Sequence, residues 1–430
     1  MQHQEVELLA IGAGPANLAL AVALEELAPE VAANSVIIER HQDVAWQRGM
    51  LLPWSQSQVS FLKDLVTLRN PRSAFSFVNY LYSVDRLDQF INLGSFTPYR
   101  LEISDYLRWV AESLRRVRIQ YGKECTSIVP RKNTAGAVVG WLVTMADGST
   151  IAARDLVIGA GRDANVPEQF RDLPRERVIH SVEFGMRVEQ LDEAASGRFA
   201  VVGGAQSAAE MLWSVHQRFP QAQCTMVMRS IGLNGYESSK FTNELFYPSF
   251  VDEFHAAEPE ARAQLLREMH RSNYAGLAPA TLDTLYRQMY LERLTDAQRL
   301  KMITMVDVAG ARLEDDTVVL SLVDRKNGQR SELCCDTVLL GTGFVPEMPR
   351  MVQNLAQALD LPAATVDRNY RLHLPSGAEA GCYLMGVNEA THGIADSLLS
   401  VLAARSGEIV NDLLERRGSD RRLSTLSLAS

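Results

Sequence analysis

The stretch that decides the fold reads Leu8-Leu9-Ala10-Ile11-Gly12-Ala13-Gly14-Pro15-Ala16-Asn17-Leu18. It passes from an apolar run typical of a buried strand, through a glycine-rich turn, into an alanine-rich run of helix formers. Such a turn brings backbone N–H groups and the positive end of a helix up to a pyrophosphate. We therefore predict that Gly12, Gly14 and Pro15 bind a dinucleotide.

The next strand-like run narrows the choice of that dinucleotide. It reads Ser35-Val36-Ile37-Ile38-Glu39-Arg40 and ends in an acid. A carboxylate at this place hydrogen-bonds a ribose 2′-hydroxyl and repels a 2′-phosphate. Glu39 and Arg40 are therefore predicted to bind FAD or NAD rather than NADP, and a solvated strand end is the alternative for Glu39.

A second turn of the same kind comes much later, in Phe199-Ala200-Val201-Val202-Gly203-Gly204-Ala205-Gln206-Ser207-Ala208-Ala209-Glu210. The strand-like run that follows it, Cys224 to Arg229, ends in an arginine. The guanidinium fork suits a 2′-phosphate, so NADPH is predicted here. An arginine without a ligand is the alternative. Two such turns indicate that the chain holds two dinucleotides and passes a hydride between them.

Composition excludes several other classes of function. The chain has 430 residues, 47% of them hydrophobic and 22% charged, and a net charge of −9. No basic run indicates a nucleic-acid partner, and no apolar run reaches the ~18 residues of a membrane span. The five cysteines are too few and scattered for a disulfide framework or a metal site. We expect a cytoplasmic protein, because the first residues lack a signal-peptide pattern.

Strand-like and helical patterns alternate along most of the chain, which predicts the α/β class. We expect two Rossmann-like dinucleotide-binding domains and a smaller, mostly helical substrate region. The predicted FAD domain covers residues 1–165 and 336–416, and the NADPH domain covers 166–233 and 301–335. The substrate region is predicted over 234–300, and a flexible tail over 417–430.

Further motifs resemble the flavin-dependent monooxygenases that hydroxylate the side-chain amine of ornithine or lysine for siderophores. The resemblance runs along nearly the whole chain. Its motifs are Trp46 to Pro53, Gln58 to Pro71, Pro98 to Glu102, Phe241 to Phe246, Ser272 to Tyr274, Asp336 to Phe344, and Thr391 to Ser400.

The resemblance implies a role for each matching residue. Lys63 and Asn243 would hold the α-carboxylate and α-amino end of the substrate. Asn273 would place the side-chain amine, with Tyr274 beside it. Ser397 belongs to the C-terminal segment that would pass both flavin and substrate, and the resemblance leaves open which of Asp396, Ser397 and Ser400 makes the contact. The flavin would be lined by Trp46, Gln47 and Gln58, and NADPH would be held by Arg100, Gln206, Ser207 and Arg229.

The resemblance also implies a reaction and partners. NADPH would reduce FAD, O₂ would form a C4a-hydroperoxide on the flavin, and the neutral amine would take its distal oxygen. L-Ornithine is the expected substrate, with L-lysine or a diamine such as putrescine or cadaverine as alternatives. A non-catalytic flavin-binding sensor is a remote alternative. No C-x-x-C pair of a disulfide reductase occurs. A homo-oligomer, by resemblance a tetramer, is expected.

Overall fold

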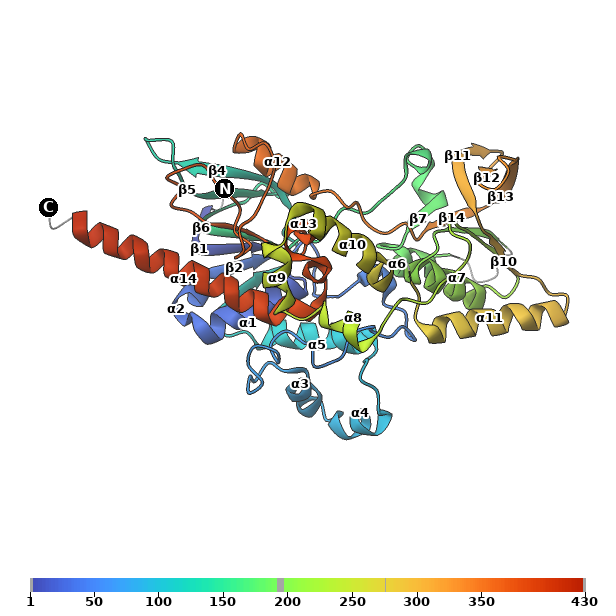
Figure 1. Cartoon of the computed structure of the whole chain (residues 1–430), viewed down its shortest axis with the longest axis horizontal. Coiled ribbons are helices and arrows are strands. Elements are labelled where there is room, and N and C mark those ends of the chain that lie inside the picture. Colours follow the sequence, from blue (N-terminus) through green and yellow to red (C-terminus); the bar gives the residue numbers. More distant parts are fainter. Residues whose placement is uncertain (1–2, 192–196, 275, 428–430) are drawn as a thin grey trace.

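The computed structural model describes residues 3–191, 197–274 and 276–427. A mixed sheet and an all-parallel sheet lie at opposite ends of the molecule, each with helices packed on it (Figure 1). We call the parts built around them the first and the second domain. This arrangement confirms the predicted α/β class.

The first sheet has seven strands, of which β1 (His3–Ile11) lies near the centre. β1 pairs in parallel with β2 (Ser35–Ile38) on one side and with β6 (Thr150–Ile158) on the other. Both neighbours are largely buried, as expected for a parallel sheet covered on both faces. The remaining strands are β3 (Arg118–Gln120), β4 (Cys125–Lys132), β5 (Val138–Met145) and β15 (Cys382–Leu384).

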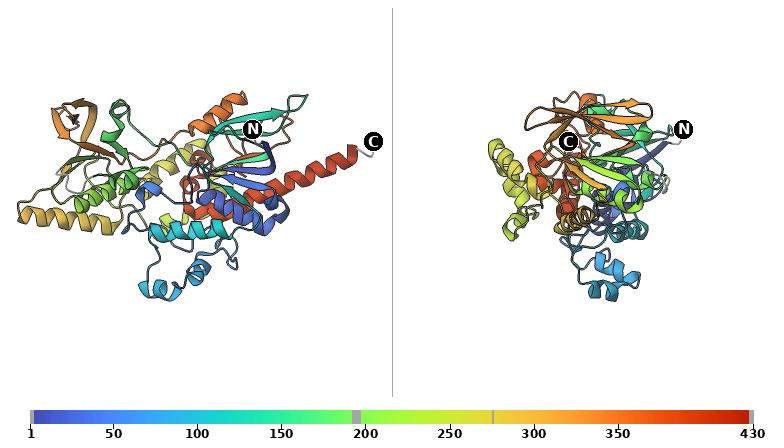
Figure 2. Two further views of the ribbon diagram at one scale, coloured as in Figure 1. Left: turned by 180° about the vertical axis from the view of Figure 1, so that it is seen from behind. Right: turned by 90° about the vertical axis from the view of Figure 1, so that its right-hand side faces the viewer.

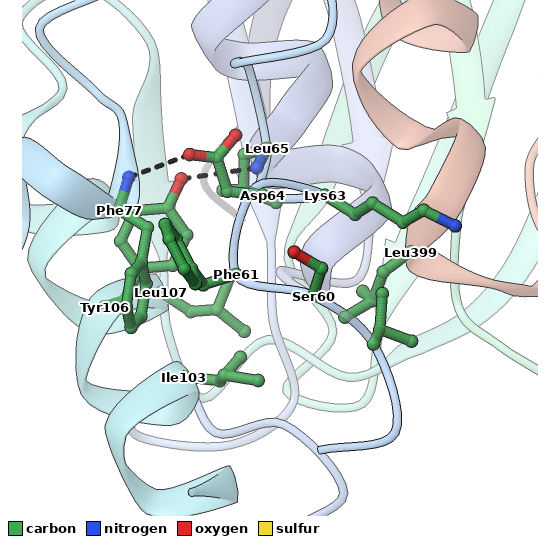
Figure 3. Close-up of a pocket in the computed structure, with 11 residues that line it drawn as sticks. Ser60, Phe61, Lys63, Asp64, Leu65, Phe77, Ile103, Tyr106, Leu107 and Leu399 are labelled. Atoms are coloured by element: carbon green, nitrogen blue, oxygen red, sulfur yellow. Dashed lines mark hydrogen bonds between the residues drawn. The ribbon is translucent and has the colours of Figure 1, made fainter. Parts of the chain in front are cut away.

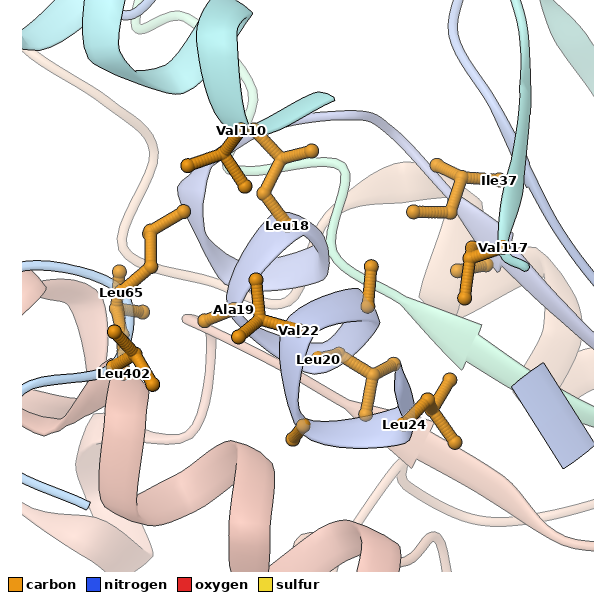
Figure 4. Packing of buried hydrophobic residues seen from close by; sticks show 14 of the residues in the cluster. Leu18, Ala19, Leu20, Val22, Leu24, Ile37, Leu65, Val110, Val117 and Leu402 are labelled. Atoms are coloured by element: carbon orange, nitrogen blue, oxygen red, sulfur yellow. The ribbon is translucent and has the colours of Figure 1, made fainter. Parts of the chain in front are cut away.

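Helix α1 (Pro15–Leu27) is deeply buried in the first domain. Its Leu18–Leu24 segment is almost without solvent exposure, because other elements cover it on several sides. Figure 4 shows Val110 of α5 (Arg100–Ser113) and Leu402 of α14 (Leu402–Ser427) packed around it. Shorter helices complete the domain: α2 (Pro29–Ala33), α3 (Phe77–Ser83), α4 (Leu87–Leu93), α12 (Arg350–Ala358) and α13 (Glu389–His392).

The second sheet has the strand order β10-β9-β8-β14-β7, and all of its pairings are parallel. Helices α6 (Phe184–Val188) and α7 (Gln206–Arg218) belong to this domain. A separate antiparallel sheet of three strands lies beside it, at the far end of the molecule (Figure 2). The strands of both sheets are β7 (Val178–His180), β8 (Arg198–Val202), β9 (Gln223–Val227), β10 (Leu300–Ile303), β14 (Thr337–Leu340), β11 (Val306–Glu314), β12 (Thr317–Asp324) and β13 (Arg330–Cys335).

One predicted boundary needs a correction. The prediction assigned residues from 336 onward to the FAD domain, but β14 pairs with β8 and β7 of the second sheet. Thr337-Val338-Leu339-Leu340 is a continuous apolar run that either sheet could bury, so its pattern did not reveal its partner. The chain returns to the first domain only after this strand.

Residues 234–300 are mostly helical, as predicted, but they do not form a single body. Helices α9 (Phe250–Ala256) and α10 (Pro259–Asn273) contact α13 of the first domain, whereas α11 (Pro279–Leu294) packs on α7 of the second (Figure 1). A short helix, α8 (Lys240–Glu244), precedes them.

The segment from 417 to 427 continues helix α14, where a flexible tail was predicted. The flexibility itself stays a prediction, and residues 428–430 lie outside the described residues.

Short 3-10 turns occupy several connections. They are η1 (Arg48–Met50), η2 (Glu168–Phe170), η3 (Arg175–Arg177), η4 (Ile394–Ser397) and η5 (Leu399–Val401).

Candidate active site

The first glycine-rich turn has the backbone geometry that its sequence demands. Gly12 has φ +91°, and a Cβ atom there would lie 2.9 Å from the carbonyl oxygen of Gly159. Asn17 stands where many such turns have a third glycine, and it is fully buried. Its Nδ2 donates to the carbonyl oxygens of Ile11 (2.9 Å) and Gly12 (2.7 Å), so the side chain fixes the turn from within.

The backbone at Gly14 is open to the close approach that a dinucleotide requires. A Cβ atom on Gly14, the residue before α1, would meet no heavy atom within 4 Å. The Oδ1 atom of Asn17 is buried and has no hydrogen-bond partner in the described residues. The open space at Gly14 and the N-terminus of α1 suit the phosphates of FAD.

Glu39 connects the end of β2 to the turn. Its carboxylate accepts hydrogen bonds from the backbone N–H groups of Ala13 (2.8 Å) and His41 (3.0 Å). The acid therefore lies beside the first glycine-rich turn, and its contact with a nucleotide ribose stays a prediction. The neighbouring Arg40 is exposed, and its Nε lies 3.3 Å from His41 Nε2.

The second turn is equally tight. Gly203 has φ +143°, and a Cβ atom there would lie 2.4 Å from the carbonyl oxygen of Gly341. Ser207 occupies the first turn of α7, and its hydroxyl makes no hydrogen bond within the described part of the chain. Arg229 follows β9 and is exposed, with no ion pair to another described residue. Both side chains are thus available to a phosphate.

Two residues predicted to hold NADPH are engaged elsewhere. Arg100 is buried and forms a two-fold hydrogen-bonded ion pair with Glu210. The Gln206 amide accepts from Ala278 N–H (2.9 Å) and donates to Glu210 (2.8 Å) and Thr281 (3.1 Å). Both side chains therefore have protein partners already, and their predicted roles in NADPH binding stay predictions.

Lys63 lies at the edge of an apolar cavity and is half-buried (Figure 3). Its Nζ donates to Ser400 Oγ at 3.1 Å, and no carboxylate in the described residues pairs with it. The adjacent Asp64 cannot serve, because its carboxylate accepts hydrogen bonds from the backbone N–H groups of Val66, Thr67 and Phe77. Burial lowers the pKa of Lys63. A cation in this position suits an anionic ligand.

A second polar cluster surrounds Tyr274. The Tyr274 hydroxyl donates to the Glu389 carboxylate and lies 3.1 Å from Ser397 Oγ. Arg162 completes the cluster, with its Nη2 3.3 Å from Glu389 Oε1. Burial, followed by the charge of Glu389, raises the pKa of Tyr274. The structure thus brings Tyr274 and Ser397 together, and it adds Arg162 and Glu389, which sequence reasoning missed.

The C-terminal segment contains three polar residues that sequence alone could not tell apart. Asp396 is buried against Arg405, with its Oδ1 2.7 Å from Arg405 Nη1. Ser400 accepts the hydrogen bond from Lys63, and Ser397 faces Tyr274. The two serines are the ones that reach predicted site residues.

The two predicted substrate asparagines carry unused amides. Asn243 is exposed on α8, and Asn273 is the half-buried last residue of α10. Neither side chain makes a hydrogen bond within the described ranges. Asn273 is adjacent to Tyr274 and so lies beside the second cluster.

The predicted flavin-lining residues follow β2 in one connection. Trp46 packs against the first-domain core, and Gln47 is exposed with φ +50°. Gln58 is exposed farther along the same connection.

The chain is similar to known proteins over nearly its whole length. Residues 4–346 match the family described as L-lysine 6-monooxygenase/L-ornithine 5-monooxygenase. The chain belongs to this family. An L-ornithine N(5)-oxygenase of Arthrobotrys oligospora is 37% identical, with 96% of this chain and 89% of the relative covered.

Two solved structures have the same fold. The ornithine hydroxylase of Pseudomonas aeruginosa superposes with a TM-score of 0.89 at 35% identity, covering 96% of this chain and 99% of that one. An ornithine N-hydroxylase of Kutzneria sp. 744, with reduced FAD, NADP⁺ and L-ornithine, gives 0.88 at 34% identity, covering 96% and 100%. Within the described ranges, this family member has no helix of the length and apolarity that crossing a membrane requires.

Proposed function

We propose that this monooxygenase uses FAD and NADPH to hydroxylate the side-chain amine of L-ornithine. The observation that carries the proposal is the half-buried ammonium of Lys63, which has no carboxylate partner in the described residues. An amino-acid substrate brings the α-carboxylate that this cation lacks. The relatives named for L-ornithine support the choice of amino acid.

The residues available to the two dinucleotides are distinct. Gly12, Gly14, Pro15 and Glu39 would hold FAD at the first turn. Gly203, Ser207 and Arg229 would hold NADPH at the second turn. When bound, the flavin supplies the oxygen-transfer chemistry, with NADPH as its reductant and O₂ as the oxygen source.

The protein must present the substrate amine in its neutral form. An alkylammonium of pKa ~10.4 costs roughly 4 to 5 kcal/mol to deprotonate at pH 7. The amide of Asn273 can hydrogen-bond a neutral amine without stabilising the cation. The Glu389 carboxylate nearby is engaged by Arg162 and Tyr274, so it is not free to pair with an ammonium.

The protein must also keep water from the reacting groups. Phe61, Ile103 and Leu399 line the cavity beside Lys63 with apolar surface (Figure 3). Phe61 in turn packs against Phe77 and Phe96, with ring centroids 5.9 and 5.8 Å apart.

Product analysis with purified protein, FAD and NADPH tests the proposal. L-Ornithine, L-lysine and cadaverine are supplied separately, and hydroxylamine product is measured apart from H₂O₂. We expect N5-hydroxyornithine to form fastest. Flavin binding without amine-dependent hydroxylamine from any of the three would support a sensor instead.

L-Lysine is the second candidate substrate, because one methylene changes binding by only ~1–3 kcal/mol. A diamine is less suited, since it leaves the Lys63 ammonium without an anion. Cytoplasmic residence and homo-oligomeric assembly also stay part of the proposal.

A further inference from the structure

Arg100 and Glu210 form a buried ion pair that joins the two domains. Arg100 begins α5 in the first domain, and Glu210 lies on α7 in the second. Nη1 and Nη2 each donate to a different carboxylate oxygen at 2.7 Å. The two side chains are only 7% and 2% exposed, so solvent screens the pair little.

On the first-domain side, this pair is tied to the connection of residues 46–58, which carries the predicted flavin-lining residues. Arg100 Nη1 also donates to the carbonyl oxygen of Met50 (3.3 Å). The backbone N–H of Arg100 donates to the carbonyl oxygen of Ser55 (2.9 Å). The same connection touches the second domain at Gly49, where a Cβ atom would lie 2.2 Å from the Ser181 carbonyl oxygen. The connection is therefore held from both sides.

On the second-domain side, the pair reaches the predicted NADPH turn. Glu210 Oε1 accepts a second hydrogen bond from Gln206 Nε2 (2.8 Å), and Gln206 is the first residue of α7. The other contacts of Gln206 are with Ala278 N–H and Thr281, at the start of α11. A continuous hydrogen-bonded network thus runs from the flavin-lining connection to the helix that follows the second glycine-rich turn.

We propose that Arg100 and Glu210 are positioning residues that set the second nucleotide turn against the 46–58 connection. The inference rests on the proposed function, because it assumes that NADPH at one place reduces FAD at the other. Neither residue needs to touch a dinucleotide. They act by fixing the distance and angle between α7 and the connection. Hydride transfer between two bound reactants tolerates only a small error in their relative position.

The variant Glu210→Gln tests this inference, because it keeps the side-chain shape while removing the charge. The matched control is Glu292→Gln. Glu292 is equally buried and pairs with His216 (2.6 Å), but both residues belong to the second domain. Three measurements are made on FAD-loaded protein: hydrogen exchange of residues 46–58, anaerobic flavin reduction by NADPH, and the KM for L-ornithine.

We expect Glu210→Gln to raise hydrogen exchange over 46–58 and to slow flavin reduction at least tenfold. The KM for L-ornithine should stay within twofold, and Glu292→Gln should leave exchange over 46–58 and reduction unchanged. The inference would be overturned if Glu210→Gln kept the wild-type rates of hydrogen exchange and flavin reduction. It would also be overturned if Glu292→Gln slowed flavin reduction as much as Glu210→Gln. Absence of hydroxyornithine from the wild type would instead contradict the proposed substrate, since exchange and reduction are measured without ornithine.

If Glu210→Gln does not fold, Arg100→Lys replaces it. Lysine keeps the charge but cannot form two parallel hydrogen bonds. The same increase in exchange and loss of reduction rate is expected, and wild-type values in Arg100→Lys would overturn the inference.

Discussion

The Nζ atom of Lys63 lies 3.1 Å from Ser400 Oγ, although 337 positions separate the two residues in the chain. The contact joins the connection after β2 to the segment just before α14. It gives the ammonium one neutral partner, and no carboxylate within residues 3–191, 197–274 and 276–427 pairs with it to compensate its charge. The hydrogen bond to Ser400 therefore holds the ammonium in position before a substrate carboxylate binds.

Lys63→Ala should raise the KM for L-ornithine roughly 10- to 150-fold, which corresponds to the ~1.5–3 kcal/mol of a hydrogen bond to a charged group. NADPH oxidation should continue and release H₂O₂, because flavin reduction does not need this residue. Steady-state kinetics with separate product and peroxide assays measure both effects. Lys301→Ala, at an exposed lysine of β10, is the control. An unchanged KM would remove Lys63 from the substrate site.

Arg229→Ala should weaken NADPH binding more than NADH binding. The guanidinium is exposed and has no ion pair in the described residues, so a 2′-phosphate would be its partner. We expect the ratio of kcat/KM for the two coenzymes to shift at least tenfold toward NADH. Arg287→Ala on α11, where Arg287 pairs with Asp283, is the control. Equal losses for both coenzymes would show that Arg229 does not read the phosphate.

His392 should make the protein less stable as pH falls. It is buried and stacked on Tyr370 with ring centroids 4.1 Å apart, and burial lowers its pKa to about 4. The positive charges of His255 and Arg368 act in the same direction, and Asp396 opposes them. Its Nε2 donates to the Arg368 carbonyl oxygen (3.1 Å), because that oxygen can only accept.

The direction of this pH dependence follows from proton binding at His392 in the folded and unfolded states. Between pH 6.5 and about 4 the unfolded chain binds a proton at His392 that the native protein does not. Stability is therefore complete above pH 6.5 and falls by roughly 3 kcal/mol as pH drops through this window. Urea unfolding of His392→Gln and of the wild type at several pH values measures this effect. The free energy of unfolding should depend less steeply on pH in the variant. Parallel curves for the two proteins would contradict this role.

Asp155→Ala should destabilise the first domain. Asp155 is fully buried at β6, and its carboxylate pairs with Arg416 (3.1 Å) and Arg417 (2.9 Å) of α14. Removing one side of a buried pair costs about 3–5 kcal/mol. We expect the lower end of that range here, because Arg417 keeps Glu7 as a partner and Arg416 keeps the Glu379 carbonyl oxygen. Urea unfolding followed by far-UV circular dichroism measures the loss. Asp147→Ala, which breaks a surface pair with Lys123, should leave the midpoint almost unchanged.

Much of the fold could be predicted because its signals are local. Gly12 and Gly203 each sit between an apolar run and a helix-forming run, and both adopt the positive φ that such a turn requires. Glu39 at the end of β2 follows from the same pattern. The helical content of 234–300 was also visible in the sequence, but the division between α10 and α11 was not.

The rest depends on contacts between distant parts of the chain. Arg100 and Glu210 are 110 positions apart, and Tyr274 and Glu389 are 115 apart. No periodicity or spacing relates such pairs, so no sequence pattern indicated that Glu210 is the partner of the Arg100 guanidinium. The partly apolar surroundings of Lys63 were easier to predict, because its neighbours in the sequence are themselves apolar.

The seven-stranded sheet is assembled from pieces that are made at very different times. β1 comes before every other described element of the sheet in the chain, whereas the seventh strand of the sheet, β15, and the covering helix α14 come after the whole of the second sheet. The five-stranded sheet is finished once β14 has emerged from the ribosome. During synthesis the second domain can therefore fold while the first still exposes an unpaired β6 edge and an uncovered α1, which is the interval in which a nascent chain most needs protection from aggregation.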